Sequence, residues 1–180
     1  MTQGWMGMSD ALGQFNGPRI RPWIGRSPAI ASMLNPGIVA LILVAASEEY
    51  ERACKKAMPW ELIYLVVPLV LHRGTREALP QSTRSHLAKW VMDNPVLQAG
   101  FPERARSLAP HVAEGFRFAL QNELVILTSE GNLSGSIPSG QKPSSQGDLV
   151  SIVKASGLMG RWFAKSERTS TLFALLGVRP

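Results

Sequence analysis

The residues best suited to acid–base chemistry or metal binding are scattered along this sequence. The three histidines, His72, His86 and His111, stand far apart, and we expect none of them to share a helical face with a second ligand-type residue three or four positions later, as a zinc-binding pair would. The single cysteine, Cys54, falls on the apolar side of a predicted helix, where no polar neighbour would lower its pKa. No GxSxG nucleophile elbow is present. The sequence therefore predicts no enzyme and no bound metal.

One tract imitates a phosphate-binding loop. Residues 135–142, GSIPSGQK, place the lysine one position late, and Pro143 stands where Ser or Thr would hold the metal ion. The tract also follows a predicted hairpin instead of joining a strand to a helix. We therefore expect no nucleotide, no other cofactor and no small-molecule substrate.

Two apolar runs, at 38–46 and 62–71, predict the elements around which the core is built. Asn35 and Pro36 fit the N-cap and first position of a helix, whose second half carries charged residues. A second helix is predicted from Pro59 to His72, kinked or split by Pro68 because proline lacks the N–H that would bond the carbonyl of Tyr64. Both runs are shorter than the roughly 18 residues of a bilayer span, so no membrane segment is expected.

The remaining elements follow in order. Helices are predicted from Ser82 or Thr83 to Asp93, from Gly100 onward with a continuous apolar stripe, from Asp148 to about Lys165, and from Thr169 to Leu176. Gly157 and Gly160 predict a close helix contact in the third of these. Residues 124–137 predict a β-hairpin. Helices followed by a hairpin predict a mainly α fold with a small β-hairpin, an α+β class with a winged-helix-like arrangement.

The predicted domain organisation is an extended N-terminal arm at 1–33 and a single helical domain at 34–180. The arm is rich in Gly and Pro and interleaves tryptophan with arginine, which suits either a disordered terminus or a docking arm. Residues 138–147, PSGQKPSSQG, have the composition of a flexible surface loop. No secretion leader opens the sequence, so we expect a cytoplasmic protein.

The sequence is basic, with 19 Lys and Arg against 13 Asp and Glu, a formal charge of +6. This charge favours an anionic partner or an acidic protein surface, although solvated charged faces would look the same. If the fold is winged-helix-like, three residues lie where they would meet DNA phosphates: Arg73, Arg84 and Lys89. No base-reading signature accompanies them.

Several blocks together resemble one known family. They are LNPGIVALIL at 34–43, PWELIYLVVPLVLHRGTREALPQST at 59–83, WVMDNP at 90–95, GFPERARSLAP at 100–110, GRWFAK at 160–165 and LLGVRP at 175–180. In this order they resemble the middle component of three-component ABC-ATPase systems, the Lamassu-type bacterial defence operons. The resemblance spans residues 34–180, apart from the predicted loop at 138–147.

The resemblance implies a non-catalytic adapter between an SMC-like (Rad50-like) ABC ATPase, expected as a dimer, and an effector, commonly a nuclease, in anti-phage and anti-plasmid defence. Any contact with DNA is expected to be made through the assembled complex. By analogy, polar residues in the matching blocks are interface candidates: His72, Thr75, Arg76, Glu77, Arg104, Arg106, Arg161 and Trp162. For each of them a purely structural role stays open, such as capping by Thr75 or core filling by Trp162. The alternative function is a free-standing winged-helix DNA-binding regulator.

Overall fold

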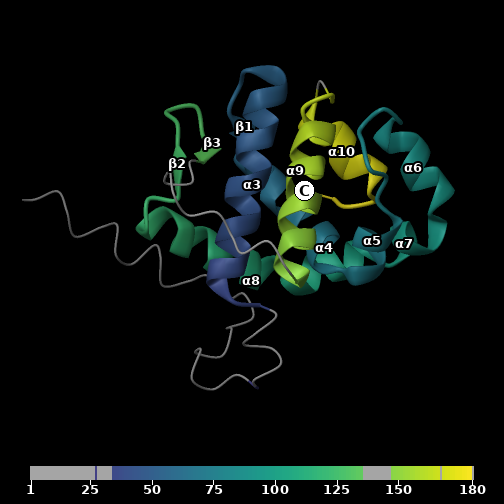
Figure 1. Cartoon of the computed structure of the whole chain (residues 1–180), viewed down its shortest axis with the longest axis horizontal. Helices are drawn as coiled ribbons and strands as arrows, with labels where there is room; N and C mark the ends of the chain where they lie inside the picture. The colour runs from purple at the N-terminus through teal and green to yellow at the C-terminus, as the bar shows by residue number, and fades with distance from the viewer. Residues whose placement is uncertain (1–26, 28–33, 136–146, 167, 180) are drawn as a thin grey trace, which may run out of the picture.

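The computed structural model describes residues 27, 34–135, 147–166 and 168–179, and Figure 1 shows how its elements are arranged. The predicted arm at 1–33, apart from Ser27, and the predicted loop at 138–147, apart from Gly147, lie outside these residues. The described part is mainly helical with one small antiparallel sheet, as predicted. Its elements are α3 (Pro36–Cys54), β1 (Met58–Pro59), η3 (Trp60–Leu62, a 3-10 helix), α4 (Ile63–Leu71), α5 (Arg73–Ala78), α6 (Leu87–Asp93), α7 (Pro95–Ala99), α8 (Phe101–Gln121), β2 (Val125–Leu127), β3 (Asn132–Gly135), α9 (Asp148–Phe163) and α10 (Thr169–Leu175).

Helix α3 begins where its sequence predicts. The Asn35 side chain accepts a hydrogen bond from the backbone N–H of Gly37 at 2.8 Å, and Pro36 occupies the first turn. The helix ends at Cys54 because Lys55 adopts a left-handed conformation (φ 60°). Between these ends the first half is buried almost all round, and the charged second half reaches the surface.

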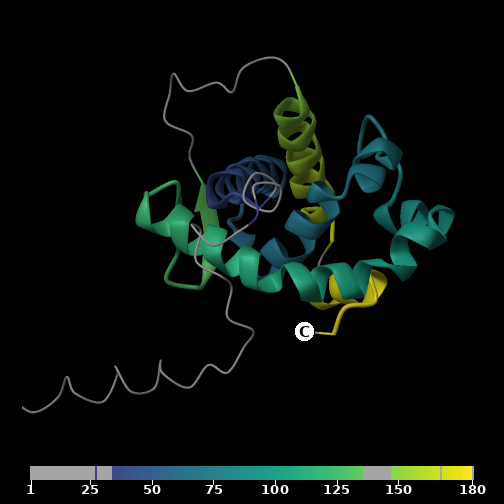
Figure 2. The ribbon, with the colours of Figure 1, turned by 90° about the horizontal axis from the view of Figure 1, so that it is seen from below.

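The other elements pack around α3, which α8, α9, α4 and the sheet all contact (Figures 1 and 2). Glycines make three of these contacts possible. A Cβ added at Gly115 of α8 would overlap the side chain of Val39, and one added at Gly160 of α9 would overlap the backbone carbonyl of Ala46. A Cβ at Gly135 of β3 would lie 2.6 Å from the hydroxyl of Ser47. The predicted close approach at Gly160 is thus confirmed.

The hairpin is present, and a strand that the sequence did not predict joins it. β2 and β3 pair antiparallel with Val125 opposite Gly135, and Gly131 (φ 75°) lies in the turn between them. β1 then pairs with the other edge of β3, so the strand order is β1-β3-β2. The sheet contacts α3 and α8. The winged-helix-like arrangement stays a prediction.

The segment predicted as one helix from Pro59 to His72 is divided differently. Pro59 is extended in β1, and a 3-10 turn follows. Helix α4 then continues through Pro68 to Leu71 and ends because His72 has an extended backbone. The next helix also starts later than predicted, at Leu87. Here the backbone carbonyl of Thr83 accepts a hydrogen bond from Lys165 and that of Ser85 accepts one from the Trp162 indole at 2.8 Å. Tertiary contacts thus replace the first helical turn expected at Ser82 or Thr83.

The long helix α8 is continuous through Pro110, and its buried side includes Ala105, Val112 and Ala119 of the predicted stripe. Helix α9 begins with Asp148 in its first turn, after Gly147 at the cap position, and ends at Phe163. Helix α10 ends before Gly177, whose φ of 69° suits a glycine stop. Within the described residues, no helix is both long and apolar enough to cross a bilayer.

The contact between α9 and α3 predicts a strong effect of one methyl group. Gly160→Ala should lower the free energy of unfolding by about 3 kcal/mol, because the added carbon would overlap the backbone of Ala46. Gly100→Ala is the matched control, since the nearest atoms to its added Cβ are 3.7 and 4.0 Å away. Denaturant unfolding of both variants measures the difference, and equal stability would contradict the close contact.

Candidate functional site

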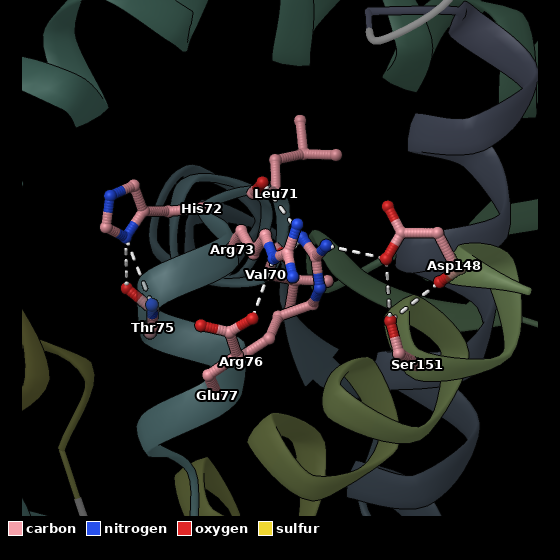
Figure 3. Close-up of polar contacts among 9 residues, drawn as sticks. All are labelled: Val70, Leu71, His72, Arg73, Thr75, Arg76, Glu77, Asp148 and Ser151. Carbon is pink, nitrogen blue, oxygen red and sulfur yellow. Dashed lines mark hydrogen bonds and ion pairs between the residues drawn. The ribbon is translucent and has the colours of Figure 1, made fainter.

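The predicted interface residues fall into separate neighbourhoods of the fold. His72 is the N-cap of α5, and Thr75, Arg76 and Glu77 lie within that helix (Figure 3). Arg104 and Arg106 lie on the first half of α8, and Arg161 and Trp162 lie near the end of α9. The structure brings Arg76 and Arg161 to the same cleft, described below.

Arg76 ties three elements together. Its side chain is only 8% exposed. One guanidinium nitrogen donates to the last carbonyls of α4, on Val70 at 2.8 Å and Leu71 at 2.9 Å, while the other pairs with Asp148 in the first turn of α9 at 2.8 Å (Figure 3). Because α4 ends at Leu71, these carbonyls have no helical partner, and Arg76 satisfies them. Its first role is therefore structural.

His72 caps helix α5. Its Nδ1 accepts the backbone N–H of Thr75 at 3.1 Å and lies 2.9 Å from the Thr75 hydroxyl, so we assign the neutral ring with its proton on Nε2 (Figure 3). Burial lowers the pKa of His72 below its usual 6.5, and the neighbouring charges of Arg104 and Arg76 lower it further. Thr75 itself is fully buried, which leaves it inaccessible to a partner in this conformation.

The arginines on α8 differ in exposure. Arg104 is half-buried over the ring of Phe101, 5.6 Å from its centroid, and its Nη2 donates to the carbonyl of Leu97 at 3.4 Å. Burial lowers the pKa of Arg104. Arg106 is exposed and pairs with Glu103 at 2.8 Å. Arg106 is therefore the accessible member of the two.

On α9, Trp162 is 2% exposed and packs against Trp90 with ring centroids 5.8 Å apart. It fills the core and is also inaccessible to a partner in this conformation. Arg161 is 40% exposed and pairs with Glu49 of α3 at 2.5 Å. Glu49 pairs with Arg52 as well, so the end of α9 is joined to the charged half of α3 by an ion-pair network.

Two of the three predicted phosphate contacts are already in ion pairs. The exposed Arg73 donates to Glu77 at 2.7 Å, and Lys89 pairs with Asp93 at 3.0 Å. Arg84 is exposed beside Thr83, whose carbonyl accepts from Lys165. The fold thus brings Lys165 to the segment that carries Arg84, although the two residues are distant in sequence.

One histidine has a ligand-type neighbour that the sequence prediction missed. His111 Nδ1 lies 3.9 Å from a carboxylate oxygen of Glu114, three positions later on α8. Among the residues that the structure describes, no group of three or more His, Cys, Asp and Glu side chains is placed to hold a metal ion.

The main surface feature that sequence reasoning missed is a cleft of about 700 Å³. It lies between the second half of α3, helix α9 and the segment that follows α5. Its lining residues are Ala45, Glu48, Glu49, Arg76, Leu79, Pro80, Gln81, Ser151, Val153, Lys154, Ala155, Gly157, Leu158 and Arg161. No local pattern could have revealed it, because its walls come from three stretches separated by up to a hundred residues.

Comparison with known proteins identifies one family. Residues 23–180 match the family model described as ABC-three component (ABC-3C) system Middle Component 3. The chain matches no curated protein and no solved structure.

The two arginines of α5, Arg73 and Arg76, should differ sharply in their contribution to stability. Arg76→Ala should lower the free energy of unfolding by roughly 2–3 kcal/mol because it leaves the α4 carbonyls and Asp148 without their donor. Arg73→Ala, which removes an ion pair between two exposed side chains, should leave the free energy of unfolding almost unchanged. Thermal or denaturant unfolding compares them, and a neutral Arg76→Ala would show that Arg76 does not hold these elements together.

The His72 cap predicts a pH dependence. Because the folded pKa lies below the unfolded value of 6.5, the contribution of His72 to stability is full above pH 6.5 and is lost as the pH falls through the lower folded pKa. His72→Asn keeps a capping oxygen that does not titrate. The variant should therefore lose less stability than the natural protein between pH 7.5 and pH 5, measured by urea unfolding. Parallel losses would contradict a neutral histidine cap.

Proposed function

The chain belongs to the Middle Component 3 family of ABC-three component systems, and we propose that it is the non-catalytic adapter subunit of such a system. In this proposal it links an SMC-like (Rad50-like) ABC ATPase, acting as a dimer, to an effector subunit, commonly a nuclease. The complex would act in cytoplasmic defence of Lamassu type against phages and plasmids. The adapter itself would use no cofactor and turn over no small molecule.

The family match over residues 23–180 is the observation that carries this proposal, since it includes every residue that the structure describes. The structure supports an adapter in a second way. The network that joins Glu49 to Arg52 and Arg161 fixes charged side chains at the edge of a cleft, and fixed charges of both signs favour specific docking of another protein. Arg106 and Glu77 are further exposed candidates for contacts.

The alternative is a free-standing DNA-binding regulator. It is favoured by the contact of Lys165 with the Thr83 carbonyl, which places this lysine on the segment that carries the exposed Arg84. The ion pairs of Arg73 and Lys89 weigh against it, because phosphate binding would have to displace Glu77 and Asp93. We therefore place the adapter first, with any DNA contact made through the assembled complex.

Assembly tests the adapter directly. When this protein is co-expressed with the other two components of its system, all three should elute as one complex in size-exclusion chromatography. Omitting this protein should leave the ATPase and the effector apart, because the adapter supplies their connection. An ATPase and an effector that associate equally well without it would contradict the proposal.

DNA binding separates the alternative. The isolated adapter should bind duplex DNA no more tightly than a non-specific basic protein, with Kd of roughly 10⁻⁴–10⁻⁶ M at physiological salt. A regulator should bind its site at least a thousandfold more tightly and retain this preference over other sequences as salt rises. Fluorescence anisotropy across a salt series measures both, and tight, sequence-dependent binding by the isolated chain would favour the regulator.

A further inference from the structure

The cleft has an apolar centre made by three separate elements. α3 contributes Ala45, α9 contributes Leu158, and the segment after α5 contributes Leu79 and Pro80. The volume of about 700 Å³ falls within the range of concave sites that accept several side chains of a ligand. The two helices meet closely at the floor of the cleft, because Gly160, one turn beyond the cleft residue Gly157, allows α9 to contact the backbone of α3.

The two helical walls of the cleft carry opposite charges. The α3 wall bears Glu48 and Glu49, while the α9 wall bears Lys154 and Arg161. The 2.5 Å pair between Arg161 and Glu49 joins the walls over Gly157, where an added Cβ would lie 3.0 Å from Cγ of Glu49. The cleft thus combines apolar lining residues with an acidic edge on α3 and a basic edge on α9.

This charge pattern selects the chemistry of the occupant. The charged groups of a nucleic acid are phosphates alone, and the acidic edge formed by Glu48 and Glu49 would repel them. A protein segment can carry both charges, one on each side of an apolar stripe, and so match both edges. The pattern therefore favours a protein segment over a nucleic acid.

We propose that this cleft is the docking site for a short amphipathic segment of one of the other two components of the system. Its apolar side chains pack beside Leu79 and Leu158, its acidic residues face Lys154, next to the pair of Arg161 with Glu49, and its basic residues face Glu48. The inference rests on the proposed adapter function. It adds which surface of the adapter binds another component and which contacts hold the two together.

Two variants test the cleft without altering its packed floor. Gln81→Trp places a large ring at an exposed position on the rim, where it blocks entry, and Lys154→Glu reverses an exposed charge on the basic edge. Lys56→Glu is the matched control, since it makes the same reversal at an exposed position outside the cleft, just beyond α3. Thermal unfolding and circular dichroism establish that each variant is folded before its binding is measured.

The readout is the Kd of each full-length variant for each of the two purified components, measured by biolayer interferometry at one fixed salt concentration. For one component, Gln81→Trp and Lys154→Glu should each weaken binding roughly tenfold or more, while Lys56→Glu should change it less than about twofold. Folded cleft variants that bind both components as well as the natural protein would overturn the inference, and equal weakening by Lys56→Glu would also overturn it by showing a general charge effect. Failure of the natural protein to bind either component would instead overturn the proposed function on which the inference rests.

Discussion

The close packing of three elements on helix α3 is the constraint on which the rest of the structure depends. Gly115 of α8, Gly135 of β3 and Gly160 of α9 each stand where a single added methyl group would meet the helix or its side chains. Contacts this close fix the angle at which each element crosses α3 and its position along that helix, because tightly packed interiors resist deformation. The long buried half of α3 is therefore a common reference surface for parts of the chain that are distant in sequence.

The candidate surface follows from this arrangement. Because Gly160 holds α9 against Ala46, the next residues of both helices place Glu49 and Arg161 within reach of each other, and the cleft opens beside that pair. The third wall is positioned separately. Arg76 holds α5 against the end of α4 and against Asp148, so the segment that follows α5 closes the cleft from the remaining side. A stable core and a defined surface thus use the same contacts.

Much of this architecture could be predicted from local sequence, and the exceptions share one cause. Asn35 and Pro36 marked the start of α3, and the turn residues near Gly131 marked the hairpin, because caps and turns depend on a few neighbouring residues. Strand β1 could not be predicted, since its two residues become a strand only by pairing with β3. The late start of α6 has the same origin, because Trp162 of α9 and Lys165, which follows α9, bind the carbonyls of Ser85 and Thr83. Arg76 resembled a surface arginine in sequence, and its burial depends on α9, which lies some seventy residues further along the chain.

The central claim is that this protein contributes a rigid surface to which another component of its system binds. Hydrogen exchange of the protein alone and in the assembled complex tests it most directly, with attention to residues 79–86, which lie outside regular helices beside the cleft. The account predicts that amides of this segment, together with the exposed side of α9, exchange more slowly in the complex. Unchanged exchange there, with protection confined to the hairpin or to α8, would contradict it.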